Sequence, residues 1–154
     1  MGKIEQKIKE LGLVLPSPPA PVGNYLPWTR AGNLVFISGQ LPRIEGKIIY
    51  LGKVPKEVSI DDAKESAKLC LLNALSVLKS ALGSLDRVKQ VVRLNCFIAS
   101  ESDFFAQAEI ANGASELLVE IFGERGRHSR VTTGVNVLPG NASVELDLIV
   151  EVEE

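Results

Sequence analysis

The 154-residue sequence has little of the material from which most metal and nucleophile sites are built: one histidine, two cysteines, one methionine and one tryptophan. A single histidine and two separated cysteines leave a structural zinc site short of ligands, so we expect no metal. The chain also lacks a GxxxxGKS/T phosphate loop, a GxGxxG turn, an HExxH motif and a GxSxG nucleophile elbow. The commonest nucleotide, zinc and serine-hydrolase signatures are therefore excluded, and we expect no cofactor.

Charge and hydropathy exclude two further classes of protein. The chain has 17 Lys and Arg residues against 19 Asp and Glu residues, a net charge of −2, and no basic patch interleaved with aromatics, so a nucleic-acid partner is not expected. No apolar run approaches the length of a membrane span. The opening sequence MGKIEQKIKELGL carries both charge signs, unlike a secretory signal. We therefore expect a cytoplasmic protein without a membrane partner.

The rare reactive residues each have a plain interpretation. Cys70 falls in a helical pattern and Cys96 in a strand-like one, which is typical of buried free thiols in a reducing compartment; a disulfide or redox pair is the alternative. His128 lies in a polar Gly/Arg connector, where an exposed loop position is the expectation and a general base the alternative.

The length predicts one domain covering residues 1–154, long enough for a single core. Its first part, residues 1–23, differs from the rest. Ile4, Ile8 and Leu11 recur at helical spacing and predict a short helix before Gly12. The stretch PSPPAP at residues 16–21 then forbids regular structure, because proline has no amide hydrogen and restrains the residue before it.

Strands and helices alternate along the remainder. Residues 24–40 indicate two strands around an Ala31-Gly32-Asn33 turn, and residues 47–51 a short third strand. Ser59 with Asp62 predicts the cap of a long helix that ends at Gly83. Residues 88–99 indicate a central strand. Ser100 with Asp103 predicts the cap of a second helix that ends at Gly123.

The C-terminal part predicts a closing β-hairpin, because residues 131–138 and 143–152 flank a Pro139-Gly140-Asn141 turn signal. Alternation assigns the valines of both strands to a helix-covered face. The opposite faces then carry the polar residues of most chemical interest, which are Arg130, Thr132, Asn136, Glu145 and Asp147.

The element order is β-β-β-α-β-α-β-β, and it predicts an α+β fold with two helices packed on one face of a mixed sheet. The other face mixes Arg93, Asn95 and Asp147 with Val91, Phe97 and Ile149, so it is too polar for a core and too apolar for open water. Burial against other subunits, with polar clefts at the boundaries, satisfies both requirements.

Several motifs, in order, resemble the Rid family, also called the YjgF or endoribonuclease L-PSP family. They are Ser38-Gly39-Gln40 with Tyr25 thirteen residues earlier, Arg130-x-Thr132, Leu138-Pro139 and Val144-Glu145-Leu146-Asp147. The resemblance extends from about residue 24 to residue 152, and the longer N-terminus with the GRHSR lead-in indicates a divergent branch. It implies a chorismate-mutase-like fold and a homotrimer with three clefts between subunits.

The resemblance also implies an activity, the hydrolysis of reactive 2-enamines and 2-imines to 2-keto acids and ammonia. Arg130 falls on the residue that pairs with the substrate carboxylate, and Glu145 on the residue that positions water. Tyr25 falls on the family's tyrosine, and Gly39 on the glycine that lets the backbone approach the ligand. Thr132 stands where the family often has a cysteine, which removes any thiol chemistry there. The family's mechanism chiefly uses main-chain groups at this position, so the resemblance implies that Thr132 binds the substrate through its backbone.

These residue types suit that chemistry. A guanidinium binds a carboxylate bidentately and stays charged at any working pH, and a carboxylate such as Glu145 can accept a proton from attacking water. The residues by themselves also fit a structural ion pair between Arg130 and a nearby acid. Two other functions stay open, a non-catalytic trimer that binds small carboxylates such as keto or fatty acids, and an endoribonuclease.

The predicted hairpin has a consequence for the site. It places the residue opposite Glu145 near Asn136, six positions from Arg130, which is roughly 20 Å along a strand. Two side chains of one chain so far apart are not expected to hold one small substrate. We therefore expect Arg130 of one subunit to meet Glu145 of a neighbour.

Overall fold

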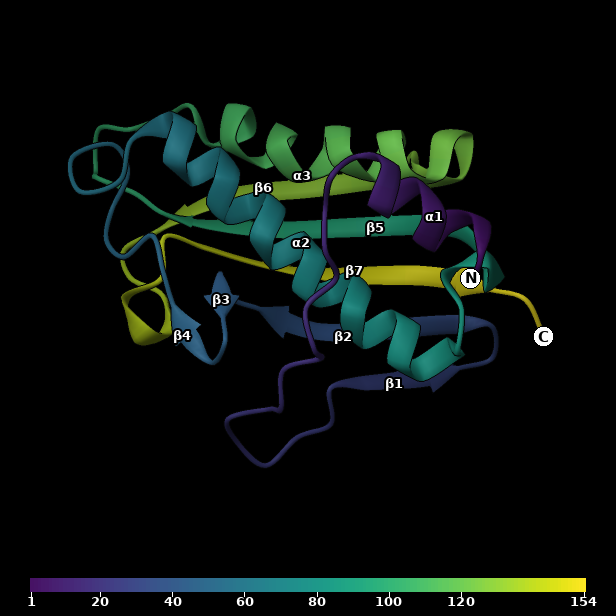
Figure 1. Cartoon of the computed structure of the whole chain (residues 1–154). Coiled ribbons are helices and arrows are strands. Elements are labelled where there is room, and N and C mark those ends of the chain that lie inside the picture. Colours follow the sequence, from purple (N-terminus) through teal and green to yellow (C-terminus); the bar gives the residue numbers. More distant parts are fainter.

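A computed structural model describes residues 1–154 as a mixed β-sheet with helices on one face (Figure 1). The predicted α+β class, with helices packed on one face of a mixed sheet, is confirmed. The helices are α1 (Lys3–Glu10), α2 (Ile60–Leu82) and α3 (Gln107–Phe122). The strands are β1 (Trp28–Ala31), β2 (Leu34–Gln40), β3 (Arg43–Ile44), β4 (Lys47–Ile48), β5 (Val88–Ala99), β6 (Ser129–Val135) and β7 (Val144–Val152).

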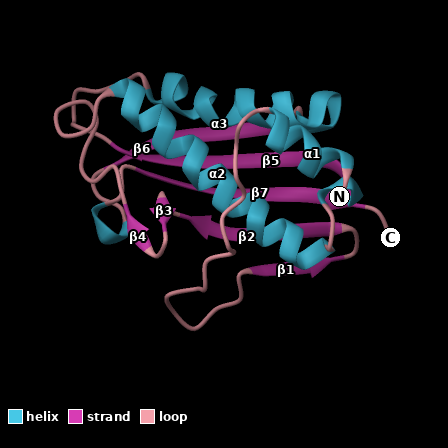
Figure 2. Cartoon of the chain, in the orientation of Figure 1, coloured by secondary structure: helices cyan, strands magenta, loops and turns pink.

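The main sheet has the strand order β1-β2-β7-β5-β6, and β3 pairs with β4 in a separate small hairpin. Only β5 and β6 run parallel; the other neighbours are antiparallel. Figure 2 shows α2 and α3 lying across the same face of the sheet, with α1 beside them. None of the three helices combines the length and the apolar composition that a membrane-spanning helix requires.

The predicted closing hairpin is wrong, because β5 lies between β6 and β7. The residues after β6 pass over the end of β5, where Ser100 N donates to Val135 O and Ala99 N donates to Ser143 O. The Pro139–Asn141 turn therefore belongs to a connection that crosses one strand instead of joining two neighbours. The long interior strand β5 pairs along both of its edges, so it separates two strands that are adjacent in sequence.

The predicted face assignment is also inverted in β6. Arg130 lies opposite Leu94, and Thr132 opposite Cys96, and both of these β5 residues are buried in the core beneath the helices. Val131, which was assigned to the covered face, is 45% exposed on the other side. Glu145 lies opposite Phe97 on the open face of the sheet, as predicted.

The two long helices begin differently. Ser59 Oγ accepts a hydrogen bond of 3.1 Å from Asp62 N at the start of α2, and Gly83, with φ +82°, ends the helix, as predicted. The cap predicted at Ser100 is wrong, because that hydroxyl donates to Ile98 O and α3 begins only after Ala106.

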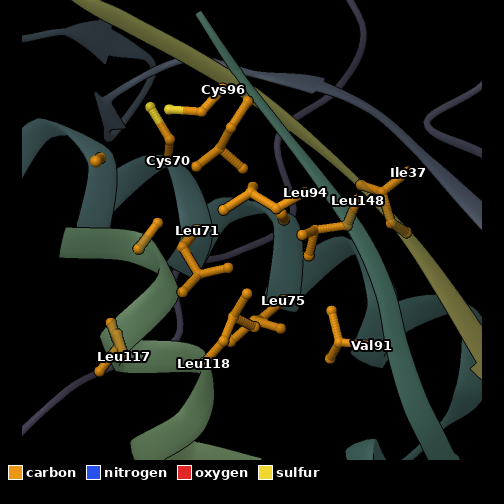
Figure 3. Packing of buried hydrophobic residues seen from close by; sticks show 14 of the residues in the cluster. Ile37, Cys70, Leu71, Leu75, Val91, Leu94, Cys96, Leu117, Leu118 and Leu148 are labelled. Carbon is orange, nitrogen blue, oxygen red and sulfur yellow. The ribbon is translucent and has the colours of Figure 1, made fainter. Parts of the chain in front are cut away.

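The core lies between the sheet and the helices. In Figure 3, Leu71 and Leu75 of α2 and Leu118 of α3 pack toward Leu94 and Leu148 of the sheet. The same view shows the sulfur atoms of Cys70 and Cys96 turned toward one another. Both cysteines are fully buried free thiols, as predicted, and burial raises the pKa of Cys96 to about 12.

The N-terminal part ends in an extended segment. Helix α1 buries Ile4 and Ile8, and the Asp86 carboxylate accepts hydrogen bonds from the amides of Lys3 and Ile4 at its start. Residues 14–22, which we call the strap, follow without a helix, a strand or any backbone hydrogen bond. This agrees with the predicted effect of the prolines, and packing alone keeps the strap on the molecule.

Candidate functional site between the strap, strand β2 and strand β7

A cavity of about 440 Å³ lies where the strap, β2, the β3–β4 hairpin, the Pro139–Asn141 turn and the start of β7 meet. Its size is within the range of small-molecule sites. Three residues singled out from the sequence lie together in its wall: Tyr25, Gly39 and Glu145. Ser38, Gln40 and Arg43 add further polar groups.

Gly39 makes room for the Glu145 carboxylate. The pairing of β2 with β7 slips between Ile37 and Gln40, so that the strand bulges at this point. A Cβ atom added to Gly39 would lie 2.6 Å from Glu145 Oε2, closer than any ordinary contact. The absence of a side chain at this position is therefore what lets the carboxylate lie against the strand.

The Glu145 carboxyl group is partly withdrawn from water. Burial raises its pKa above the ordinary value of 4.5, and the neighbouring charge of Asp147 raises it further. The pKa of Asp147 is raised by burial as well, although a hydrogen bond from Asn95 and the charge of Arg93 oppose that rise. Asn95 Nδ2 donates to Asp147 Oδ1 at 2.7 Å, and Arg93 Nε donates to Asn95 Oδ1 at 3.1 Å.

Arg130 lies elsewhere, on the edge strand β6. Its Nη1 donates to Asn112 Oδ1 at 2.8 Å and to Ser115 Oγ at 3.1 Å, both on α3. It forms no ion pair, so the interpretation as a structural pair with an acid of the same chain is wrong. The side chain lies in a second, shallower depression of about 570 Å³ together with His128.

One chain therefore does not bring Arg130 and Glu145 together. They are separated by β5 and by three positions of register, about 14 Å between Cα atoms at about 4.8 Å per strand and about 3.3 Å per residue. They also lie on opposite faces of the sheet, since Leu94 and Phe97 point to opposite sides. Thr132 lies on the side of Arg130, and its hydroxyl is buried without a hydrogen-bond partner.

His128 is half-buried, so the predicted exposed loop position is wrong. Its Nε2 lies 2.8 Å from Ser115 Oγ, and its Nδ1 lies 2.6 Å from Gly126 O. These contacts fix the ring beside Arg130. Ser115 lies about one helical turn of α3 after Asn112, the other residue of this helix that Arg130 contacts. No group of three or more His, Cys, Asp or Glu side chains is arranged to hold a metal ion.

The chain matches known proteins over nearly its whole length. Residues 5–152 match the family described as "YjgF/chorismate mutase-like, putative endoribonuclease". Protein TCP17 of Trypanosoma cruzi is 39% identical over 97% of this chain and 94% of its own. This chain is a member of the YjgF, or Rid, family.

Two further proteins are similar to this chain over nearly its whole length. A structure of a protein of unknown function from Agrobacterium tumefaciens is 45% identical, with a TM-score of 0.91 over 98% of this chain and 92% of that one. A 2-iminobutanoate/2-iminopropanoate deaminase of Dermatophagoides farinae is 29% identical over 90% of this chain and 93% of its own. The matched range, residues 5–152, includes the strap, the residues of the cavity at Glu145 and the depression at Arg130.

Sequence reasoning missed Arg43 and the strap as parts of this candidate site. Pro19, Ala20, Pro21 and Val22 line the cavity beside Tyr25, so the N-terminal segment narrows it. Arg43 lies three residues after the end of the SGQ motif, but the sequence around it indicated only a loop and a turn. Its closeness to the SGQ motif was the one signal that could have identified Arg43. The contacts of Arg43 with the strap, some twenty residues earlier, leave no local pattern in the sequence.

Proposed function

We propose that the protein hydrolyses small, reactive 2-imino acids, and the 2-enamines in equilibrium with them, to 2-keto acids and ammonia. The observation that carries the proposal is the Glu145 carboxylate, held against Gly39 in the wall of a cavity with its pKa raised. The D. farinae relative named as a 2-iminobutanoate/2-iminopropanoate deaminase supports it.

The chemistry follows from an acid–base group beside an electrophilic carbon. Water attacks the C2 atom of the protonated imine and passes one proton to the Glu145 carboxylate, which gives a tetrahedral carbinolamine. Glu145 then returns that proton to the amino nitrogen. As the C–N bond breaks, ammonia leaves, and the hydroxyl group releases its proton to water and becomes the carbonyl of the 2-keto acid. One water is consumed for each imine. A carboxyl group whose pKa is raised toward neutrality exchanges protons in both directions more readily than an ordinary glutamate.

The substrate carboxylate requires a cation, and we assign it to Arg130 of a neighbouring subunit in a homotrimer. Arg130 of the same chain faces the helices, whereas Glu145 faces the open side of the sheet. The open side and the adjacent edge carry exposed apolar groups, Phe36 at 38% and Val131 at 45%, which a neighbouring subunit would cover. The planar guanidinium would bind the carboxylate through two hydrogen bonds.

The test generates 2-aminoacrylate and its imine in place and follows pyruvate and ammonia with and without the protein. We expect the protein to accelerate hydrolysis and Glu145→Gln to abolish the acceleration. Glu151→Gln is the matched control, because Glu151 lies on the same strand and the same face but outside the cavity. Binding of 2-oxobutanoate without any acceleration would overturn the enzyme and favour a carboxylate-binding trimer.

A further inference from the structure

We propose that Arg43 binds a second carboxylate on the substrate, so that the preferred substrates are 2-imino acids with an acidic side chain. The inference rests on the proposed function, because it assigns the 2-carboxylate to Arg130 and the side-chain carboxylate to Arg43. It adds a specificity residue on the β3–β4 hairpin that lies far from Arg130 of the same chain.

The charge of Arg43 has no partner in the protein. The three ion pairs of the structure join Lys64 to Glu109, Lys68 to Glu65 and Arg127 to Glu124, and the Arg43 side chain makes no hydrogen bond. Glu145 lines the same cavity, yet no oxygen of it lies within 4.0 Å of the guanidinium. Arg43 is half-buried at the cavity wall, and its guanidinium without a partner can bind an anion from outside the protein.

The backbone of Arg43 is fixed in place. Asn73, a residue of α2 that is only 2% exposed, donates through Nδ2 to Leu41 O at 3.0 Å and to Arg43 O at 3.1 Å. Arg43 N also donates to Leu41 O at 2.9 Å. A buried amide that holds two carbonyl groups of one short segment keeps the arginine at the cavity, which reduces the entropy lost when a ligand binds.

Arg43 also lies where two cavities meet. A neighbouring cavity of about 840 Å³, between the strap, the hairpin and α2, shares Pro19, Ala20 and Arg43 with the candidate site. Figure 1 shows the chain leaving α1 and running across α2 toward the β3–β4 hairpin before it turns back to β1. Arg43 therefore borders both cavities, and the additional space beside it suits a longer side chain than the methyl or ethyl group of the simplest imino acids.

The experiment compares two imines, each generated in place by an amino-acid oxidase: 2-iminopropanoate, with a neutral side chain, and 2-iminoglutarate, with an acidic one. For the unmodified protein we expect a higher kcat/KM on 2-iminoglutarate. Arg43→Gln should lower that value by about 10- to 100-fold, as expected for a charge-assisted contact, and change the value for 2-iminopropanoate by less than about threefold. Arg43→Lys should retain part of the preference.

Lys47→Gln is the matched control, since Lys47 carries the same charge on the other strand of the hairpin, is exposed and lines neither cavity. It should leave both substrates unchanged. If Arg43→Gln lowers kcat/KM equally on both substrates, Arg43 binds the 2-carboxylate or supports the fold. If it lowers kcat/KM on neither, Arg43 binds no substrate. Either result overturns the proposal.

Binding of the products separates this inference from the proposed function. Calorimetry with 2-oxoglutarate and pyruvate needs no catalysis, and we expect Arg43→Gln to weaken 2-oxoglutarate binding alone. If the protein hydrolyses neither imine, the proposed activity fails while the calorimetry still decides whether Arg43 selects a second carboxylate. If the protein is active but binds both keto acids equally in both forms, the assignment of Arg43 fails alone.

Discussion

At Gly39 a single methyl group should damage the site without damaging the fold. Gly39→Ala places a carbon atom 2.6 Å from Glu145 Oε2, so the carboxylate must move. The backbone there has no left-handed conformation, and an alanine can adopt it. We expect kcat to fall about tenfold or more, because a catalytic group displaced by about 1 Å loses its alignment. Steady-state kinetics and thermal unfolding of the same preparation measure the two effects separately.

A second substitution checks this reason. Adding Glu145→Asp to Gly39→Ala should recover part of the lost activity, because the shorter side chain leaves room for the new methyl group. Gly32→Ala is the control: it meets no atom within 4 Å, but it strains a backbone with φ +59°, so it should lower stability and leave kcat unchanged. Equal losses of activity in both alanine variants would show that the site does not depend on Gly39.

Asp147 should set the pH range of the activity. Since burial and Asp147 raise the pKa of Glu145 above 4.5, the carboxylate needed as base is lost as the pH falls through that raised value. Asp147→Asn removes a negative charge, which lowers the pKa of Glu145 and moves the acid limb of kcat/KM to lower pH. The amide oxygen can still accept the hydrogen bond from Asn95. The control Glu151→Gln should leave the acid limb of kcat/KM in place. If Asp147→Asn also leaves that limb in place, the charge of Asp147 does not affect the pKa of Glu145.

At the scale of one element, helix α2 depends on its first residue. Ser59→Ala removes the hydroxyl that accepts from Asp62 N, and we expect the free energy of unfolding to fall by about 1 kcal/mol. Ser80→Ala, near the exposed end of the same helix, should change it little. Chemical denaturation of both variants measures the difference, and equal midpoints would mean that the cap contributes nothing.

The elements themselves were predictable wherever a local pattern specifies them. The spacing of apolar residues and the cap at Ser59 fixed the position of α2, and alternation located β5 and β7. Pairing is not local. Residues 136–143 look like a hairpin turn, yet they cross the end of β5, because that long apolar strand takes partners on both sides. The local pattern of β6 does not predict that Arg130 donates hydrogen bonds to residues of α3.

The same distinction between local patterns and distant contacts applies to the residues of the candidate site. The order of motifs identified Tyr25, Gly39 and Glu145, and the structure places these three in one cavity wall. Arg43 and the strap join them only through contacts that are distant in sequence, which no spacing rule reveals. Arg130 came from the same motifs, but its position on the far side of β5 follows from a strand order that the sequence pattern did not predict.

At the scale of the whole molecule, the sheet has one face without helices and two edge strands, β1 and β6. Strand β6 carries Arg130, and the open face carries Glu145 and the Arg93–Asn95–Asp147 network. A subunit packed against both would bring its own cavity toward the Arg130 of its neighbour. A monomeric variant should therefore keep the fold of the core and lose the activity, even with every residue of the site present.

Complementation between two inactive variants tests this arrangement. Arg130→Ala and Glu145→Gln should each abolish hydrolysis in a pure preparation. If each site takes Arg130 from one chain and Glu145 from the next, random reassembly of equal amounts gives about one quarter of the sites both intact residues. Activity near that fraction of the unmodified protein is the expected result, measured after dissociation and reassembly, with mixed oligomers verified by mass. If both residues came from one chain, no site would be complete, and verified mixed oligomers would remain inactive.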